Sequence, residues 1–236
     1  MGFVYVFDHE AQDWVFYDDM KDAIPVRNYG IVPLKAFKNA CGSDMAWTDA
    51  RALEALALLL IYASPHTLQY GFRRVEEKIH IGQSAHYAGL AFHVGKGLSM
   101  RQQVKVARLA LDVCGFDRVE PLIATPGWVH VEKTVAPPSN MSGGYPVLQM
   151  GDKGVHVMLL QDVLHLHVER AACALTGSFT EGTALDVRRF QKIKKMPVTG
   201  IVDSATWQAL LQSYTGMSCM KKSQKTTGMK MKRPLL

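Results

Sequence analysis

Residues 69–95 have the sequence QYGFRRVEEKIHIGQSAHYAGLAFHVG, and residues 119–132 have the sequence VEPLIATPGWVHVE. These two segments carry four of the nine histidines in the chain: His80, His86, His93 and His130. Neutral imidazole is the commonest protein ligand for metals, and a catalytic zinc site combines three protein ligands with one open position. Four histidines in glycine-rich or strand-like segments favour a metal site, while their spacing alone is also compatible with surface or core histidines.

The chain around these histidines predicts a mixed α+β fold. Residues 2–17 alternate apolar and polar side chains in places and predict a β-hairpin, and residues 128–132 predict a strand. Helices are expected over 50–63, with Thr48 as the N-cap, and over 99–114. We therefore expect an N-terminal domain over residues 1–136, built from a small antiparallel sheet with flanking helices.

A change of composition separates this domain from the rest of the chain. Residues 137–145 contain proline, serine and glycine in the proportions of a linker. Beyond them, apolar residues recur at helical spacing in three stretches, separated by Thr-Gly turns at 176–177 and 199–200. This pattern predicts a small all-α domain of three helices over residues 146–213.

The net charge of +6 comes from one end of the chain. Six basic residues lie among the last sixteen, and the remainder of the chain has 21 basic and 21 acidic residues. We expect residues 214–236 to be a disordered basic tail that attracts polyanions, whereas the neutral body argues against a nucleic-acid groove. The longest apolar run, residues 55–63, is too short for a membrane span, and the first residues lack the pattern of a signal peptide.

The C-terminal segments share a pattern with a known family. They have the sequences LQMGDKGVHVMLLQDVL (148–164), GSFTEGTALDVRRFQ (177–191) and VTGIVDSATWQALL (198–211). The spacing of Gly, Val, Leu-Gln, Phe and Thr-Trp resembles the peptidoglycan-binding domain of the three-helix type. The resemblance implies binding to cell-wall glycan or stem peptide, with most matched positions serving the core.

The histidine segments resemble a second family. Ser84-x-His86-x-x-Gly-x-Ala-x-His93 is similar to the Ser-x-His-x-x-Gly-x-Ala-x-Asp motif of the zinc D-Ala-D-Ala carboxypeptidase and L-alanyl-D-glutamate endopeptidase group. The resemblance, over residues 45–135, implies that Zn²⁺ is bound by His86, His93 and His130. It also implies a substrate-binding role for Arg73, from the match of Gly-Phe-Arg to the family's Gly-Tyr-Arg, and places His80 and Ser84 at the same cleft.

Two departures from this family affect the chemistry. The aspartate ligand is replaced by His93, which gives either a three-histidine zinc site or a site that has lost its metal. Many members carry a glutamate as general base at the position of Gly127. Glu132 is the best replacement, because residues two apart on a strand point to the same side, and Glu120 is the second candidate. A solvent-facing Glu132 without a catalytic role is the alternative.

Together, the two resemblances predict a monomeric zinc peptidase that hydrolyses a peptide bond in peptidoglycan stem peptides. The alternative is a non-catalytic peptidoglycan-binding protein with a degenerate peptidase domain. We expect a location in the cell wall or outside the cell after release, by a route that the sequence does not define. The basic tail over residues 214–236 is expected to contact anionic wall polymers.

Overall fold

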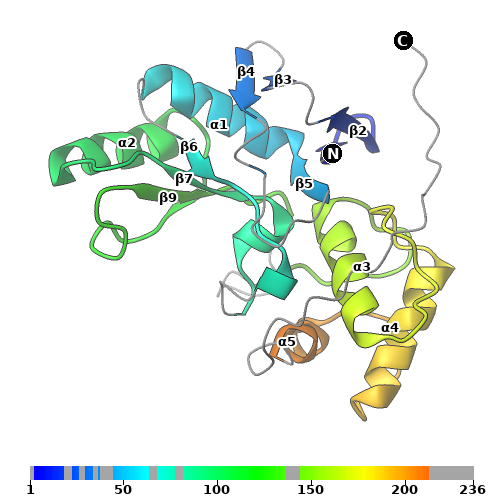
Figure 1. Cartoon of the computed structure of the whole chain (residues 1–236). Helices are drawn as coiled ribbons and strands as arrows, with labels where there is room; N and C mark the ends of the chain where they lie inside the picture. Colours follow the sequence, from blue (N-terminus) through cyan, green and yellow to red (C-terminus); the bar gives the residue numbers. More distant parts are fainter. Residues whose placement is uncertain are drawn as a thin grey trace.

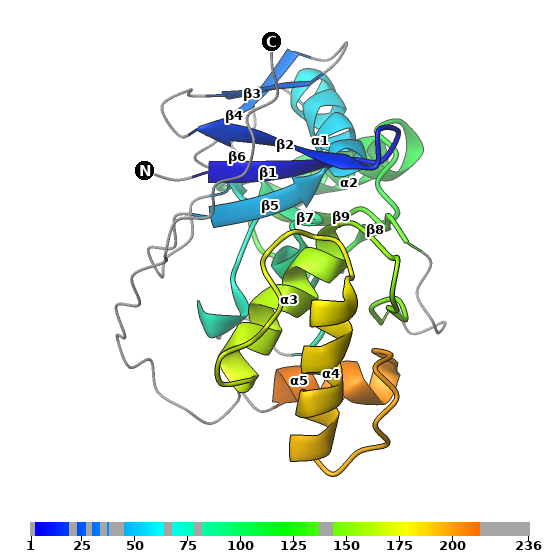
Figure 2. The same ribbon diagram turned by 90° about the vertical axis from the view of Figure 1, so that its right-hand side faces the viewer.

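The computed structural model describes residues 3–18, 23–26, 30–33, 37, 45–63, 68–77, 82–136 and 144–212. An α+β N-terminal region with small sheets is followed by a C-terminal region of three helices, as predicted (Figures 1 and 2). His80, residues 137–143 of the expected linker, and the expected tail over 214–236 lie outside the described residues.

The first sheet is built on the N-terminal hairpin. β1 (Phe3–Asp8) pairs antiparallel with β2 (Asp13–Asp18), which confirms the predicted hairpin. On its other edge β1 pairs in parallel with β5 (Met45–Asp49), a strand that the sequence analysis did not identify. β3 (Ala23–Val26) and β4 (Gly30–Pro33) form a separate two-stranded sheet.

The first helix begins one residue later than the predicted cap requires. α1 (Ala50–Tyr62) has Asp49 as its N-cap, and the carboxylate of Asp49 accepts from the backbone N–H of Arg51 at 3.0 Å. Thr48 was the wrong choice because its side chain is directed away from the first turn of the helix. Its buried hydroxyl donates instead to the carbonyl of Gly89 at 2.6 Å and so ties β5 to the histidine-bearing segment.

A four-stranded antiparallel sheet packs against α2, which in turn contacts α1. Its order is β6-β7-β9-β8, and the 3₁₀ helices η2 and η3 precede β7 in the chain. The predicted strand over 128–132 is β9, and the predicted helix over 99–114 is α2. The bounds are β6 (Leu68–Tyr70), η2 (Val75–Glu77), η3 (Ala85–Ala88), β7 (Ala91–Val94), α2 (Met100–Asp112), β8 (Arg118–Val119) and β9 (Val129–Glu132).

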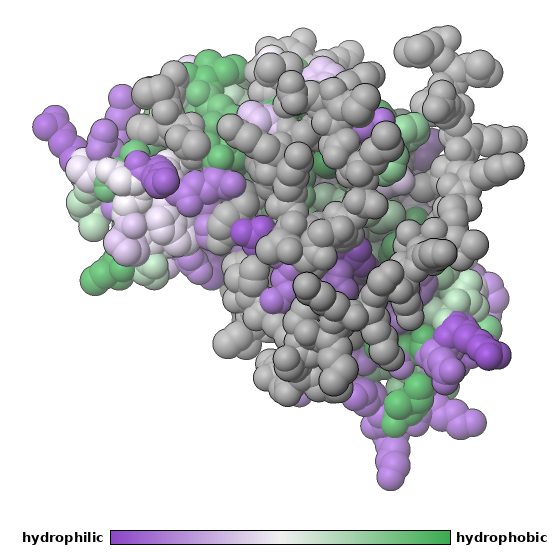
Figure 3. Space-filling model, in the orientation of Figure 1, coloured by the Kyte–Doolittle hydropathy of each residue, from purple (hydrophilic) through white to green (hydrophobic). Residues whose placement is uncertain are grey.

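The C-terminal region consists of α3 (Val155–His167), α4 (Glu181–Ile193) and α5 (Ser204–Gln212). At the lower right of Figure 3, hydrophilic side chains are interrupted by a small hydrophobic patch. Ile193, at the end of α4, is exposed. None of the helices within the described residues is long and apolar enough to cross a membrane.

Two glutamines organise the C-terminal region in the same way. The side-chain oxygen of Gln161 on α3 accepts from the backbone N–H groups of Thr176 and Gly177, both at 2.8 Å, and its amide donates to Ser178 O. On α4, Gln191 makes the equivalent bonds to the backbone of residues 199–201. Each helix is therefore fastened to the turn that follows it, and both turns lie at the predicted Thr-Gly positions.

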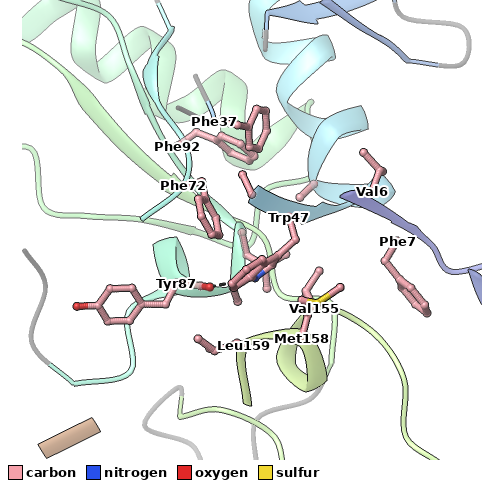
Figure 4. Close-up of a cluster of buried hydrophobic side chains, with 14 of the residues drawn as sticks. Val6, Phe7, Phe37, Trp47, Phe72, Tyr87, Phe92, Val155, Met158 and Leu159 are labelled. Atoms are coloured by element: carbon pink, nitrogen blue, oxygen red, sulfur yellow. Dashed lines mark hydrogen bonds between the residues drawn. The ribbon is translucent and has the colours of Figure 1, made fainter. Parts of the chain in front are cut away.

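The two regions share a continuous apolar core. Trp47 of β5 lies over α3, with Val155, Met158 and Leu159 beneath its ring (Figure 4). All four side chains are at most 1% exposed. The first half of α3 is therefore covered by the N-terminal region and is not a free surface of the C-terminal helices.

Replacing Gln161 by leucine should destabilise the protein. The substitution keeps the size of the side chain but leaves the backbone N–H groups of Thr176 and Gly177 without their acceptor. We expect the free energy of unfolding, measured by urea denaturation, to fall by about 3 kcal/mol. The control Gln208→Leu, at an exposed position of α5, should change it by less than about 0.5 kcal/mol. Equal effects of the two substitutions would contradict this role of Gln161.

Stability should fall in acid because of His156 on α3. Burial lowers the pKa of His156 from 6.5 to about 4. Below pH 6.5 the unfolded chain binds a proton that the folded chain does not. The stability that His156 contributes is therefore complete above pH 6.5 and is lost as the pH falls towards 4, by about 3 kcal/mol.

Urea denaturation of His156→Gln at a series of pH values measures this contribution. The difference in unfolding free energy between wild type and variant should change by about 3 kcal/mol between pH 7 and pH 4. The control is His165→Gln, because His165 is exposed on the same helix. A difference that stays constant over this range would contradict the assignment.

Candidate metal centre

Three buried histidines from three elements face one another. His93 on β7 pairs directly with His130 on β9 in the antiparallel register, so their side chains leave the same face of the sheet. His86 comes from η3, which immediately precedes β7. The exposed fractions of the three residues are 0% for His86, 5% for His93 and 6% for His130. The structure thus brings together all three residues that were predicted as ligands.

The facing ring nitrogens lie at the distances expected around a shared ion. Nε2 of His93 is 3.0 Å from Nε2 of His86 and 3.1 Å from Nδ1 of His130. An imidazole nitrogen carries either one N–H or one lone pair, so this single atom of His93 cannot form two good hydrogen bonds. The candidate ligand atoms of the three residues all lie within 4.8 Å of one another. The cluster can therefore bind a metal of the kind that imidazole favours, such as Zn, Cu, Fe or Ni.

Local sequence fixes the turn that carries His86. The hydroxyl of Ser84 caps η3 by accepting from the backbone N–H of His86 at 3.3 Å. Gly89 ends η3 with φ +70°, and a Cβ atom there would lie 1.9 Å from the carbonyl oxygen of Trp47. Only glycine fits this position, which gives a physical reason for the glycine of the Ser-x-His-x-x-Gly pattern.

Glu132 contacts His130 on the ring nitrogen that the cluster does not use. Its Oε1 lies 2.8 Å from Nε2 of His130. A carboxylate at this position accepts the Nε2 proton and leaves the lone pair of Nδ1 directed at the other histidines. Burial opposes ionisation of Glu132, but the hydrogen bond from His130 and the positive charge of Arg118 lower the pKa of the carboxyl group.

Glu120 lies on the other edge of the same imidazole. Its Oε2 is 4.0 Å from Nδ1 of His130, the nitrogen that faces the cluster, and its side chain is 40% exposed. Its backbone N–H donates to the carbonyl of His130 at 3.1 Å. This bond fixes the start of the loop that connects Glu120 to His130. The two predicted acids therefore flank His130, and Glu120 is the one beside the facing nitrogens.

The loop between Glu120 and His130 explains the glycine at position 127. Gly127 has φ +85°, a value that favours glycine, and a Cβ atom there would lie 3.4 Å from the backbone nitrogen of Gly97. Its carbonyl accepts from the N–H of Leu98 at 2.9 Å. A glutamate at this position would strain the loop.

Two residues beside the cluster were not singled out by the sequence analysis. The ring of Trp128 stacks on His93 with centroids 3.9 Å apart. The side-chain amide of Gln103 on α2 donates to the carbonyls of Thr125 and Trp128, at 2.6 and 2.7 Å, and holds this loop in place. Gln103 is 2% exposed, on the same helix face as Val106. The sequence signal that could have identified Gln103 is its position as a polar residue on the apolar face of α2.

The remaining predicted site residues have structural contacts. The guanidinium of Arg73 lies 3.9 Å from the carboxylate of Glu77, and the backbone N–H of Arg73 donates to the carbonyl of His86 at 3.2 Å. The carbonyl of Ser84 accepts from the hydroxyl of Tyr145 at 2.6 Å. Substrate binding by Arg73 and Ser84 stays a prediction.

The cluster should bind one divalent ion per chain. We expect isothermal titration of the metal-free protein with Zn²⁺ or Co²⁺ to give a stoichiometry of one, and His86→Ala to lower the affinity at least 100-fold because it removes one of three ligands. The control His165→Ala, at an exposed position outside the cluster, should leave the affinity unchanged. A stoichiometry near zero, or equal effects of the two variants, would contradict the assignment.

The C-terminal helices are similar to known proteins. Residues 157–210 match the family model for a peptidoglycan binding domain. Among solved structures, the crystal structure of the SleB N-terminal domain is 31% identical, over 29% of this chain and 92% of that chain, with a TM-score of 0.28. No curated protein matches the chain. The family match assigns residues 157–210, although not the histidine-bearing region, to the peptidoglycan-binding domains.

Proposed function

We propose that the protein is a zinc-dependent peptidase that hydrolyses a peptide bond in peptidoglycan stem peptides. The observation that carries the proposal is the convergence of three buried imidazoles beside a half-exposed carboxylate, in a chain that also contains a peptidoglycan-binding domain. That domain implies a location in the cell wall. We further propose that the chain acts as a monomer and that its basic tail contacts anionic wall polymers.

The donor set fits zinc. Tetrahedral zinc with Zn–N distances of 2.0–2.1 Å separates its ligand nitrogens by about 3.3 Å. His93 Nε2 lies 3.0 and 3.1 Å from the facing nitrogens of His86 and His130. Three neutral imidazoles also leave the full charge of the ion in place. A bound zinc ion supplies Lewis-acid activation of water and of the scissile carbonyl.

The acids on either side of His130 have different roles in this proposal. Glu120 is the general base, because its carboxylate is partly exposed and lies on the side of the facing nitrogens. Glu132 holds His130 in the tautomer that presents Nδ1 to the cluster. Arg73 binds a carboxylate of the stem peptide through charge-assisted hydrogen bonds. The proposed base is therefore Glu120, the second candidate of the sequence analysis, and not Glu132, the first.

A non-catalytic wall-binding protein is the second candidate function. Gly127 favours it, because the related peptidases carry their general base there and the backbone conformation of this loop suits glycine. In that case the histidine cluster is a structural metal site, and the C-terminal domain alone carries the function.

The two functions differ in whether purified wall material is cleaved. We expect the zinc-loaded protein to release new amino groups from peptidoglycan sacculi. Glu120→Gln should lower kcat by about 10²–10⁴-fold with zinc affinity retained, because the amide keeps the shape but accepts no proton. Glu132→Gln should instead lower zinc affinity by about 10–100-fold, because it disturbs the orientation of His130.

The matched control is Asp117→Asn, an exposed acid beside the β8–β9 ladder whose carboxylate contacts Lys133. It should change neither measurement. Zinc binding without cleavage of any muropeptide would favour the non-catalytic function. A loss of kcat in Glu132→Gln with normal zinc affinity, together with an active Glu120→Gln, would exchange the roles of the two acids.

A further inference from the structure

The three histidines are not held by the same part of the molecule. His93 and His130 are fixed by direct pairing of β7 with β9. His86 lies on η3, a single turn of 3₁₀ helix that is not part of this ladder. The position of the third imidazole therefore depends on the contacts that η3 and its flanking residues make outside the sheet.

Tyr145, the last residue of the expected linker, supplies the contacts before η3. Tyr145, 4% exposed, donates from its hydroxyl to the carbonyl of Ser84 at 2.6 Å, and its backbone N–H donates to the side chain of Gln83. The ring of Tyr145 packs in turn edge to face against Trp207 of α5, with centroids 5.0 Å apart. The cap of η3 is thus connected through one residue to the core of the three helices.

A buried ion pair provides the second connection. Asp162 lies on α3, where nearly all neighbouring residues are apolar, and its side chain is 2% exposed. It pairs with both ends of the Arg74 guanidinium, with Nε 3.3 Å from Oδ2 and Nη2 in contact with Oδ1. A buried carboxylate requires such a partner. The residue before Arg74 is Arg73, whose backbone N–H donates to the carbonyl of His86.

The apolar contact between β5 and α3, called the apolar seam below, provides a third connection. Trp47 donates from Nε1 to the carbonyl of Tyr87, the neighbour of His86 on η3, at 3.1 Å (Figure 4). Beneath its ring, α3 contributes Val155, Met158 and Leu159. The guanidinium of Arg74 lies 6.0 Å from the centre of the same ring. The segment that carries His86 is therefore supported from below by α3.

We propose that the peptidoglycan-binding domain is a structural part of the metal centre, with Asp162 of α3 and Tyr145, which packs on Trp207 of α5, acting as positioning residues for His86. This inference rests on the proposed metal site but makes a separate claim: the third ligand is placed by the C-terminal region. Neither residue belongs to the three-histidine cluster, so their effect on the centre passes through Arg74, Ser84 and the backbone of η3.

Cobalt binding tests this inference in the full-length protein. The visible absorption of bound Co²⁺ reports the coordination geometry, and its titration gives the affinity. We expect Asp162→Asn to shift the spectrum and to weaken binding by about 10–100-fold, the range found when groups behind a metal ligand are removed. Tyr145→Phe, which deletes one hydroxyl and keeps the ring, should shift the spectrum in the same way and serves as the test if Asp162→Asn does not fold.

The control is Asp186→Asn in the same domain. Asp186 is also fully buried, pairs with Arg189 at 3.0 Å and accepts from the backbone N–H of Cys173 at 2.7 Å, but it has no contact with the segment of His86. It should lower the melting temperature and leave the cobalt spectrum unchanged. Unchanged spectra in both Asp162→Asn and Tyr145→Phe, or an equal shift in Asp186→Asn, would overturn the inference while leaving the metal site intact. Failure of the wild type to bind Co²⁺ or Zn²⁺ would overturn the proposed function and this inference together.

Discussion

The antiparallel pairing of β7 with β9 is the constraint on which the candidate centre depends. It places His93 directly opposite His130, so that two imidazoles leave the same face of the sheet at the close spacing of paired residues. The same register carries Glu132 to the outer nitrogen of His130 and holds the loop with Glu120 at the other edge of the ring. A slip of one residue would turn His130 to the opposite face and separate all of these groups.

His130 lies between two carboxylates with different surroundings, and the proposed function gives each of them a different role. Its two nitrogens meet different carboxylates, one within hydrogen-bond distance and one 4.0 Å away. The first contact selects the tautomer, while the second acid keeps part of its surface in contact with solvent. Proton transfer requires an acid that can exchange with water, whereas orientation requires one that is held in place. The partly exposed Glu120 and the more buried Glu132 meet these opposite requirements.

Much of the centre could be predicted from sequence because its signals are local. The three histidines lie in short motifs, and the Thr-Gly turns follow their helices at regular spacing. Thr48 and Asp49 were harder to separate, since either can cap a helix and the choice depends on the hydrogen bond of Thr48 to Gly89, 41 residues away. The parallel pairing of β1 with β5 joins segments about 40 residues apart and leaves no periodic pattern. Asp162 was visible as a charge in an apolar helix, but its partner is 88 residues away.

The seam between α3 and the N-terminal region determines how wall binding would act on the centre. A binding domain on a flexible linker raises the local concentration of substrate and lets the second site sample many positions. Here Trp47 and α3 share one core, and an ion pair and a tyrosine cross the same boundary. Such a boundary leaves the two regions little freedom to change their relative position. A polymer held by the C-terminal helices would meet the histidines at one fixed distance and angle, so the spacing of the wall itself would select the bond presented to them.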